Sequence, residues 1–325
     1  MDQKLFKISL WRQTSGDKIM AVYVNTNYSA LQGQRYLSNV NNSLTTTYQR
    51  LSSGMRINSA KDDAAGLQIA DRLTSQINGL NQGNRNASDG IALAQTIESG
   101  IDEISGMLQK VRTLAVQAAN GTNTAEDRTA LAKEASSLVA EMQRIATQTT
   151  YGGKTVLGGN TNNSIYSGGG TKTKAGTMTL QVGSNKGDTI SFTVESFVFS
   201  QLVHGNTDGF NTDNNLKGKE ASKGQAVAFS TAEEAAKLIQ SMDKIIAKVD
   251  AQRADLGAIQ NRLESSIRNQ SNVAANEADA RSRIRDADFA EESASLSQQS
   301  IIQQAAASML MQANTRPQLG LSLLG

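Results

Sequence analysis

The chain lacks cysteine altogether and has little proline or aromatic residue. Its 325 residues include no cysteine, one proline and 4% aromatic residues. The absence of cysteine excludes disulfides and thiolate chemistry, and it removes the commonest structural zinc ligands. No apolar run approaches the roughly 18 residues of a membrane helix, so we predict no membrane span. With so few aromatic residues, we expect burial to come from aliphatic stripes on packed helices rather than from one thick globular core.

An excess of charge of either sign is also missing. The formal net charge is +2 at pH 7. Proteins that bind nucleic acids usually show a basic excess or a basic face, so we predict no nucleic-acid partner. A chain this close to neutrality is free to associate with copies of itself.

The longest uninterrupted helical pattern covers residues 231–316. Residues 258–316 contain neither glycine nor proline, and Pro317 follows directly. Thr231 and Glu234 match a capping box at the other end. We predict one helix over 231–316 with a coiled-coil seam, which requires partner helices because a single stripe hides too little surface. The seam positions follow steps of four and three: Leu238, Met242, Ile245, Val249, Leu256, Ile259, Leu263 and Val273.

Three earlier segments repeat this helical pattern and are the expected partners. Capping patterns begin them at Ser29, Ser59 and Thr124, and Gly54 and Gly121 follow the ends of the first two. A break near Gly90 is expected because glycine weakens helices. Their apolar positions are Leu37, Val40, Leu44 and Leu51, then Ile69, Leu73, Ile77 and Leu80, then Ile97, Ile101, Ile104, Leu108, Val111 and Ala115, and finally Leu131, Ala135, Leu138, Met142 and Ile145. We predict a mainly α fold, a long antiparallel helical bundle formed by both chain ends.

The middle of the chain has a different composition and predicts a small β-rich insertion. Residues 152–224 hold 14 of the 27 glycines. Apolar residues alternate over 178–182 and 190–194, on either side of the turn 183–187, which predicts a β-hairpin. We also expect strand at 197–203 and at 226–229.

Catalytic and ligand-binding patterns are sparse, and we predict no catalytic, cofactor or metal site. His204 is the single histidine and stands in a segment that we interpret as a loop. Because the chain has no second histidine and no cysteine, the common metal sites cannot form, and a Ser-His triad could use only His204. Residues 168–170 are glycines, but no GK[ST] follows them. The acidic pairs at 62–63, 233–234 and 291–292 are typical of helix starts and solvated faces.

Residues 1–19 differ from the rest of the chain and contain Trp11, the single tryptophan. A secretory signal needs a longer apolar centre, and Lys7 interrupts this one. We interpret residues 1–19 as an extraneous upstream stretch before a start at Met20.

Several ordered motifs resemble the terminal regions of bacterial flagellin. They are RLSSG at 50–54, RINSAKDDAAGL at 56–67, LQKVRTLAV at 108–116, QRADLG at 252–257, ARSRIRDAD at 280–288 and LSLLG at 321–325. The resemblance covers about residues 20–156 and 231–325. It implies an extracellular, non-enzymatic subunit that is exported unfolded and polymerises into the flagellar filament. It also implies an export chaperone, the filament cap and hook-filament junction proteins as partners.

The resemblance further implies a division of the chain into layers. Residues 20–59 and 286–325 would form a terminal coiled-coil layer that is disordered in the monomer. Residues 60–156 and 225–285 would form a helical rod domain, and 157–224 an outward-facing insertion. Apolar stripes without enough cover should fold fully only when neighbouring subunits bury them. The predicted self-assembly residues are Leu37, Val40, Leu44, Leu51, Leu296, Ile301, Ile302, Met309 and Leu310, and those of the last segment form a wide stripe rather than a seam.

Family likeness also implies a face read by the host innate immune receptor for flagellin. Its residues are Gln109, Lys110, Val111, Arg112, Leu114 and Glu134. Lys110 stands where strongly recognised members are expected to have arginine, so weaker recognition is expected. The competing interpretation for Val111 and Leu114 is that they belong to or flank the helical seam.

Three alternatives to a purely structural filament subunit remain. A hook-filament junction protein would share the terminal helices. A filament subunit with a metallopeptidase insertion is disfavoured because no HExxH motif occurs. An intracellular coiled-coil scaffold would not need the β insertion.

Overall fold

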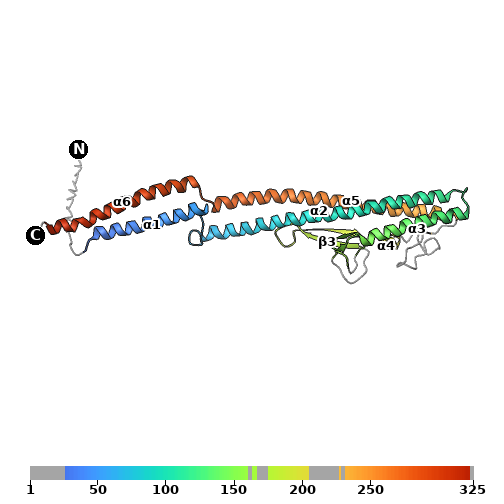
Figure 1. Ribbon diagram of the computed structural model, residues 1–325, viewed down its shortest axis with the longest axis horizontal. Helices are drawn as coiled ribbons and strands as arrows, with labels where there is room; N and C mark the ends of the chain where they lie inside the picture. The colour runs from blue at the N-terminus through green and yellow to red at the C-terminus, as the bar shows by residue number, and fades with distance from the viewer. Residues whose placement is uncertain (1–25, 160–162, 167–174, 205–226, 228–230, 323–325) are drawn as a thin grey trace, which may run out of the picture. The chain divides into compact units, whose positions relative to one another are not determined.

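The computed structural model describes residues 26–159, 163–166, 175–204, 227 and 231–322 (Figure 1). The stretch 1–19 and most of the strand expected at 226–229 lie outside these ranges. The described chain is mainly helical with a small β-rich part, which confirms the predicted fold class. Its elements are α1 Tyr28–Ser53, α2 Ala64–Ala119, α3 Ala125–Gln148, β1 Thr150–Tyr151, β2 Lys154–Thr155, β3 Ala175–Gln181, β4 Thr189–Glu195, α4 Phe199–His204, α5 Ala232–Arg285 and α6 Phe289–Ser322.

The chain divides into two units. One takes Met1–Ala70 and Ser282–Gly325, and the other takes Asp71–Arg281, so α2 and α5 contribute residues to both. In the first unit α1 and α6 lie side by side (Figure 1). Asn27, just before α1, donates to the carbonyl of Ala313 near the end of α6, whereas Arg50 pairs with Glu292 at its beginning. The two ends of the chain are therefore antiparallel, as predicted.

Side-chain caps explain where several helices begin and end. Asn27 caps α1 by accepting from the Ala30 N–H at 3.1 Å, so the expected capping box at Ser29 is wrong by two residues. Gly54 ends α1 at a φ of 70°, a left-handed conformation that suits glycine. Thr124 and Asp127 form the predicted capping box of α3, and the donors of Thr124 hold the pKa of Asp127 below its usual range. The box at Thr231 is also present.

The start of α2 differs from the prediction. Asp62 accepts from the backbone N–H groups of Ser59 and Asn58, which hold its pKa low, but these residues form a turn that precedes the helix. The helix begins at Ala64, where Asp63 accepts from the Gly66 N–H at 2.9 Å. The two consecutive acidic residues thus have different roles: Asp62 closes the turn, and Asp63 caps the helix.

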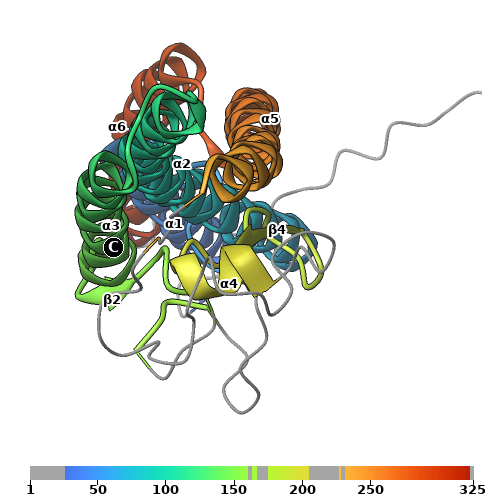
Figure 2. The same ribbon diagram turned by 90° about the vertical axis from the view of Figure 1, so that its right-hand side faces the viewer.

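The core of the second unit lies among α2, α3 and α5 (Figure 2). The predicted α2 positions from Ile97 to Ala115 are fully buried. The α5 seam is buried from Leu238 to Leu263, but Val273 is 37% exposed and Gln270 and Ala274 are buried in its place. The α5 seam is therefore confirmed except at its last position.

The buried stripe of α3 is shifted by one residue from the prediction. Ala135 and Met142 are buried as expected. The remaining buried positions of this helix are Ala132, Val139 and Ala146, while Leu131, Leu138 and Ile145 are only partly buried at the edge of the core. Small residues on the contacting stripe let the helices approach closely, and the longer side chains cover the contact from the side.

The β-rich part contains the predicted hairpin and one hairpin that we did not predict. Strands β3 and β4 are antiparallel, with Leu180 opposite Ile190 and Met178 opposite Phe192. A smaller hairpin joins β1 to β2 through Gly152 and Gly153, whose φ values are 57° and 78°. The strand expected at 197–203 is wrong, because Phe199–His204 form helix α4.

Glycines of α2 make room for the larger hairpin instead of breaking the helix. A Cβ on Gly83 would lie 2.0 Å from the carbonyl oxygen of Val182, and one on Gly90 would lie 2.3 Å from a methyl of Leu180. A Cβ on Gly79 would lie 2.7 Å from the side chain of Ser184. The break expected near Gly90 is wrong, because α2 is continuous from Ala64 to Ala119.

Gln252 occupies the seam position of α5 between Val249 and Leu256 and connects β4 to the helix by hydrogen bonds. Its side-chain amide accepts from the Glu195 N–H and donates to the Thr193 carbonyl, both at 3.2 Å. The polar residue interrupts the apolar seam, but it satisfies backbone groups of a strand that would otherwise lack partners there.

Replacing Gln252 by leucine should lower the free energy of unfolding of the second unit. The change leaves the Glu195 N–H and the Thr193 carbonyl without their partner, which costs about 1–3 kcal/mol. Chemical denaturation followed by circular dichroism measures the effect. Gln260→Leu is the control, because that amide bonds only the side chain of Glu98, which water can replace. Equal losses from the two changes would contradict this role.

The long C-terminal segment is two helices rather than the single predicted one. The chain leaves the helical path at Asp286, whose neighbour Ala287 donates to the Gly54 carbonyl at 3.0 Å. Asp288 then caps α6 by accepting from the Ala290 N–H at 2.8 Å. The helix continues to Ser322 and includes Pro317, which was expected to follow its end. Contacts with residues distant in sequence cause this break, and no local glycine or proline marks it.

Candidate functional site

The α1–α6 pair forms a coiled-coil seam whose α6 side is largely invisible in the sequence. Positions on both helices follow steps of three and four. On α1 they are Ala30, Gly33, Leu37, Val40, Leu44, Thr47 and Leu51, and on α6 they are Glu292, Leu296, Gln299, Gln303, Ala306, Leu310 and Ala313. All are buried or half-buried. The α6 side of this seam contains charged, amide and small residues, so a search for apolar spacing could not find it.

Polar contacts join the two helices along this seam in addition to apolar ones. Gln303 donates to Asn41 at 2.8 Å, and Thr47 donates to Gln299 at 3.5 Å. A Cβ on Gly33 would lie 3.3 Å from a methyl of Leu310, so the helices approach closely there. The missing signal was therefore the spacing of glutamines and alanines, which also occurs on many solvated helix faces.

The structure sorts the nine predicted self-assembly residues into two groups. The six that lie in the seam are Leu37, Val40, Leu44, Leu51, Leu296 and Leu310. The other three remain exposed: Ile301 by 67%, Ile302 by 40% and Met309 by 72%. The wide stripe expected on the last segment thus consists of a seam packed on α1 and of apolar residues beside it that remain exposed.

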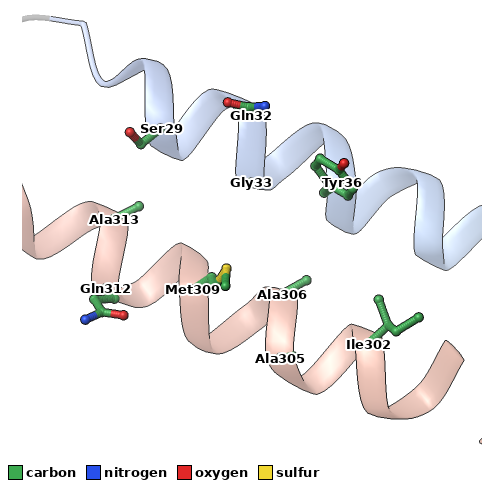
Figure 3. A pocket seen from close by; sticks show the side chains of 10 residues that line it. All are labelled: Ser29, Gln32, Gly33, Tyr36, Ile302, Ala305, Ala306, Met309, Gln312 and Ala313. Atoms are coloured by element: carbon green, nitrogen blue, oxygen red, sulfur yellow. The ribbon is translucent and has the colours of Figure 1, made fainter. Parts of the chain in front are cut away.

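An open groove of about 600 Å³ lies along the pair between the start of α1 and the end of α6. Figure 3 shows Ile302, Ala306, Met309 and Ala313 on the side of α6 that faces α1. Tyr36 of α1 lines the opposite wall. The groove is lined mainly by apolar atoms and is uncovered in the single chain.

The pair hides little apolar surface for its length. Leu44 and Thr47 are the buried residues of α1, and no described side chain of α6 is buried. Large apolar residues on both helices face solvent. They are Tyr28, Leu31, Tyr36 and Tyr48 on α1 and Phe289, Ile301, Ile302, Met309 and Met311 on α6. Such a surface is typical of an interaction site, since single chains rarely expose apolar residues in continuous patches.

An ion pair and a backbone junction fix the end of the helix pair that adjoins α2 and α5. Arg50 contacts Glu292 at 3.0 Å, and the Glu292 side chain is only 12% exposed. The Arg56 N–H donates to the Arg285 carbonyl at 2.7 Å, and Met55 forms an isolated bridge with Asp286. Ile57 is buried beside this junction. These contacts connect the α1–α2 turn to the α5–α6 turn within one unit.

Replacing Arg50 by alanine should lower the free energy needed to separate α1 from α6 by about 1 kcal/mol, because the nearly buried Glu292 carboxylate loses its partner. Hydrogen exchange of residues 28–53 and 289–322 measures the change. Arg268→Ala is the matched control, because its pair with Glu264 is well exposed and should contribute almost nothing. Equal exchange in both variants would argue against a role for the Arg50–Glu292 pair.

The residues of the expected receptor face are not equally accessible. Gln109, Lys110 and Glu134 are exposed. Arg112 is half-exposed and pairs with Asp243 of α5, which raises the pKa of the guanidinium. Val111 is fully buried in the core, so its side chain cannot contact another molecule while the helix is folded. Leu114 is half-buried against the same core.

A cluster of metal-binding side chains is not found in the described part of the chain. Its His, Asp and Glu side chains form no cluster of three that could hold a metal ion. His204 is the last residue of α4 rather than part of a loop, and its side chain lies outside the described atoms. None of the described helices is long and apolar enough to cross a membrane.

Two family matches cover most of the chain. Residues 24–162 match the bacterial flagellin N-terminal helical region, and residues 239–324 match the bacterial flagellin C-terminal helical region. Flagellin A of Vibrio cholerae serotype O1 is 35% identical, in an alignment that covers 94% of this chain and 100% of that protein. Polar flagellin C of Vibrio parahaemolyticus serotype O3:K6 is 34% identical with the same coverage.

A solved structure described as a flagellar hook-associated protein from Vibrio parahaemolyticus is also similar. It has a TM-score of 0.54 at 16% identity, covering 69% of this chain and 100% of that one. This likeness shows the fold alone and does not favour a hook-filament junction protein over the flagellins. The family matches and the relatives agree with the helical ends described above. The chain therefore belongs to the bacterial flagellins and is a structural subunit of the flagellar filament.

Proposed function

We propose that α1 and α6 form the terminal layer of the filament and polymerise through the apolar residues that the single chain leaves uncovered. The exposure of Ile301, Ile302 and Met309 beside a weak, polar seam is the observation that supports this role. A helix pair that hides so little of its own apolar surface gains most from neighbours that cover it. The seam residues then pair the helices within one subunit, and the exposed residues contact other subunits.

Seeded growth tests this role directly. Purified chain is added to short filament fragments, and elongation is followed by light scattering and negative-stain electron microscopy. We expect the complete chain to elongate the fragments, and a chain ending at Ala280, which lacks α6, to remain unassembled. Elongation by the shortened chain at the rate of the complete one would show that α6 is not part of the assembling surface.

The remaining layers and partners extend the same proposal. Residues 60–156 and 225–285 form the rod domain, and 157–224 form an outward insertion. The subunit acts without catalysis and is extracellular, after export in an unfolded state with an export chaperone and addition beneath the filament cap, distal to hook-filament junction proteins. The lack of cysteine suits this route, because no disulfide must be reduced before export. Helices rich in local contacts also refold rapidly after export.

The expected immune-receptor face is proposed in a reduced form. Gln109, Lys110, Arg112 and Glu134 are accessible to a partner, whereas the buried Val111 supports the face only from within the core. Lysine at position 110 offers a point charge in place of the planar, bidentate donors of arginine.

Lys110→Arg should strengthen receptor signalling, lowering the half-maximal concentration by roughly threefold, because the planar guanidinium can form a bidentate hydrogen bond, which the ammonium group of lysine cannot match in geometry. A reporter-cell assay with purified monomer measures the response. Lys154→Arg, at an exposed position after α3, serves as the control. Unchanged signalling by Lys110→Arg would contradict the proposal for this position.

A further inference from the structure

The methionines of the described chain fall into clearly separated classes of exposure. Met107, Met142 and Met242 are buried, and Met55 and Met178 are half-buried. Met309 and Met311 differ from all of them, with 72% and 65% of their surfaces exposed. Because oxidation of methionine follows exposure, a peroxide in solution reaches these two thioethers first.

Both exposed methionines lie on the helix that carries the uncovered apolar residues. Met309 lines the groove beside α1, where Ile302, Ala305 and Ala306 stand one or two helical turns away (Figure 3). These three neighbours offer no side-chain hydrogen-bond donor, whereas Ser29, Gln32, Tyr36 and Gln312, which also line the groove, carry one. Met311 lies two residues further on and therefore points to a different face of α6. The two thioethers thus lie on two different sides of the same helix.

We propose that Met309 and Met311 form a redox-sensitive control of assembly, in which their oxidation to methionine sulfoxide by a hydroperoxide keeps the free subunit out of the filament. This inference rests on the proposed function of α6 as an assembling helix. It adds a modification site, the chemical class of the modifying agent and a consequence for polymerisation.

The chemical step is a two-electron oxygen transfer. A lone pair of the thioether sulfur attacks one oxygen of hydrogen peroxide, so that a sulfur–oxygen bond forms and the oxygen–oxygen bond breaks. The sulfur is oxidised by two electrons and the peroxide is reduced. The oxygen now bound to sulfur gives its proton to the leaving hydroxide, which departs as water. Thiol-dependent sulfoxide reductases reverse the change, and the two sulfoxide epimers require different reductases.

The consequence follows from the polarity of the product. A thioether is an adaptable apolar group, whereas a sulfoxide carries a strong hydrogen-bond acceptor. When a neighbouring subunit covers Met309, the new oxygen loses water, and it stays unpaired unless Ser29, Gln32, Tyr36 or Gln312 turns toward it, because Ile302, Ala305 and Ala306 offer no donor. Burying an unpaired acceptor is unfavourable, and we expect elongation to slow at least about tenfold. Once covered in the filament, the same thioethers are shielded, so assembled subunits should oxidise more slowly than free ones.

The experiment compares the complete chain with two leucine variants. Free subunits are exposed to hydrogen peroxide alone, peptide mass spectrometry identifies the oxidised methionines, and seeded elongation gives the rate. Met309→Leu with Met311→Leu removes both proposed sites, and leucine conserves volume and apolarity. Met55→Leu with Met178→Leu is the matched control. Met1 and Met20, which lie outside the described residues, are present in every protein compared.

We expect the original chain and the control variant to lose elongation together with sulfoxide formation at positions 309 and 311. The Met309→Leu, Met311→Leu variant should keep its rate after the same treatment, and a mixture of both sulfoxide reductases should restore the original chain. Circular dichroism shows whether the oxidised chain is still helical. An original chain oxidised at both positions that elongates at the untreated rate would overturn the inference, and so would an equal loss in the double variant.

Failure of the proposed function gives a different result. If untreated chain does not elongate seeds, the role of α6 in assembly is wrong, and the redox control falls with it. If untreated chain elongates and oxidised chain does so equally well, only the redox control is wrong.

Discussion

Replacing Ile301 and Met309 by aspartate stops elongation of filament seeds while the free subunit keeps its helical content. Both side chains are more than two-thirds exposed in the single chain, at 67% and 72%, so the replacement removes little burial there. In an assembled subunit the same positions would be covered, and each buried, unpaired carboxylate costs several kcal/mol. We therefore expect at least about a hundredfold loss in elongation rate.

The matched control for this experiment is Ile301→Leu with Met309→Leu. These changes keep apolar side chains of similar volume at both positions, and they should elongate seeds at close to the original rate. Circular dichroism and hydrogen exchange of α6 before seeding show whether the helix pair itself has changed. Normal elongation by the aspartate variant would mean that neighbouring subunits do not cover this part of α6.

Replacing Gly83 by alanine destabilises the second unit, although alanine is the better helix former. The new Cβ would lie 2.0 Å from the carbonyl oxygen of Val182, a backbone atom that can move only if the hairpin moves. Gly83 therefore provides the space in which the end of β3 packs onto α2. Overpacking of this kind costs about 1–3 kcal/mol, which outweighs the roughly 1 kcal/mol gained in helix propensity.

Gly106→Ala in the same helix gives the opposite expectation. A Cβ on Gly106 would meet no atom within 4 Å, so this change should raise stability by about 0.4–1 kcal/mol. Thermal unfolding of both variants measures the contrast. The two unfolding temperatures should shift in opposite directions, by about 2–4 °C for each kcal/mol of change in the free energy of unfolding. A stabilised Gly83→Ala variant would show that the hairpin does not pack against α2 in solution.

The family and the helical class depended on signals that are local in sequence. Large aliphatic residues at steps of four and three marked the seams of α2 and α5, because such residues are buried almost wherever a helix presents them on one stripe. Caps at Thr124, Thr231 and Gly54 were visible for a similar reason, since a few adjacent residues satisfy the free backbone groups at a helix end. The flagellin motifs lie in these same regular segments.

Errors arose where a residue had a partner far away in the chain. Glycines of α2 suggested a break, but they leave room for Val182 and Leu180 of the hairpin. Asp286 interrupts the C-terminal segment because the backbone beside Gly54 pairs there. No local pattern contains this information, since the same glycine or aspartate is compatible with a continuous solvated helix.

The sequence by itself determined the long helical regions, the larger hairpin and the family that the chain resembles, because periodicity and capping act over a few neighbouring residues. Only the tertiary structure decided how the candidate assembly surface is divided. The seam of α6 consists of Glu292, two glutamines, two alanines and two leucines, and only their contact with α1 distinguishes this face from a solvated one. Ile301 and Met309 stay exposed because the seam residues make the close contacts with α1, whereas Met309 lines an open groove and Ile301 lies beside the seam.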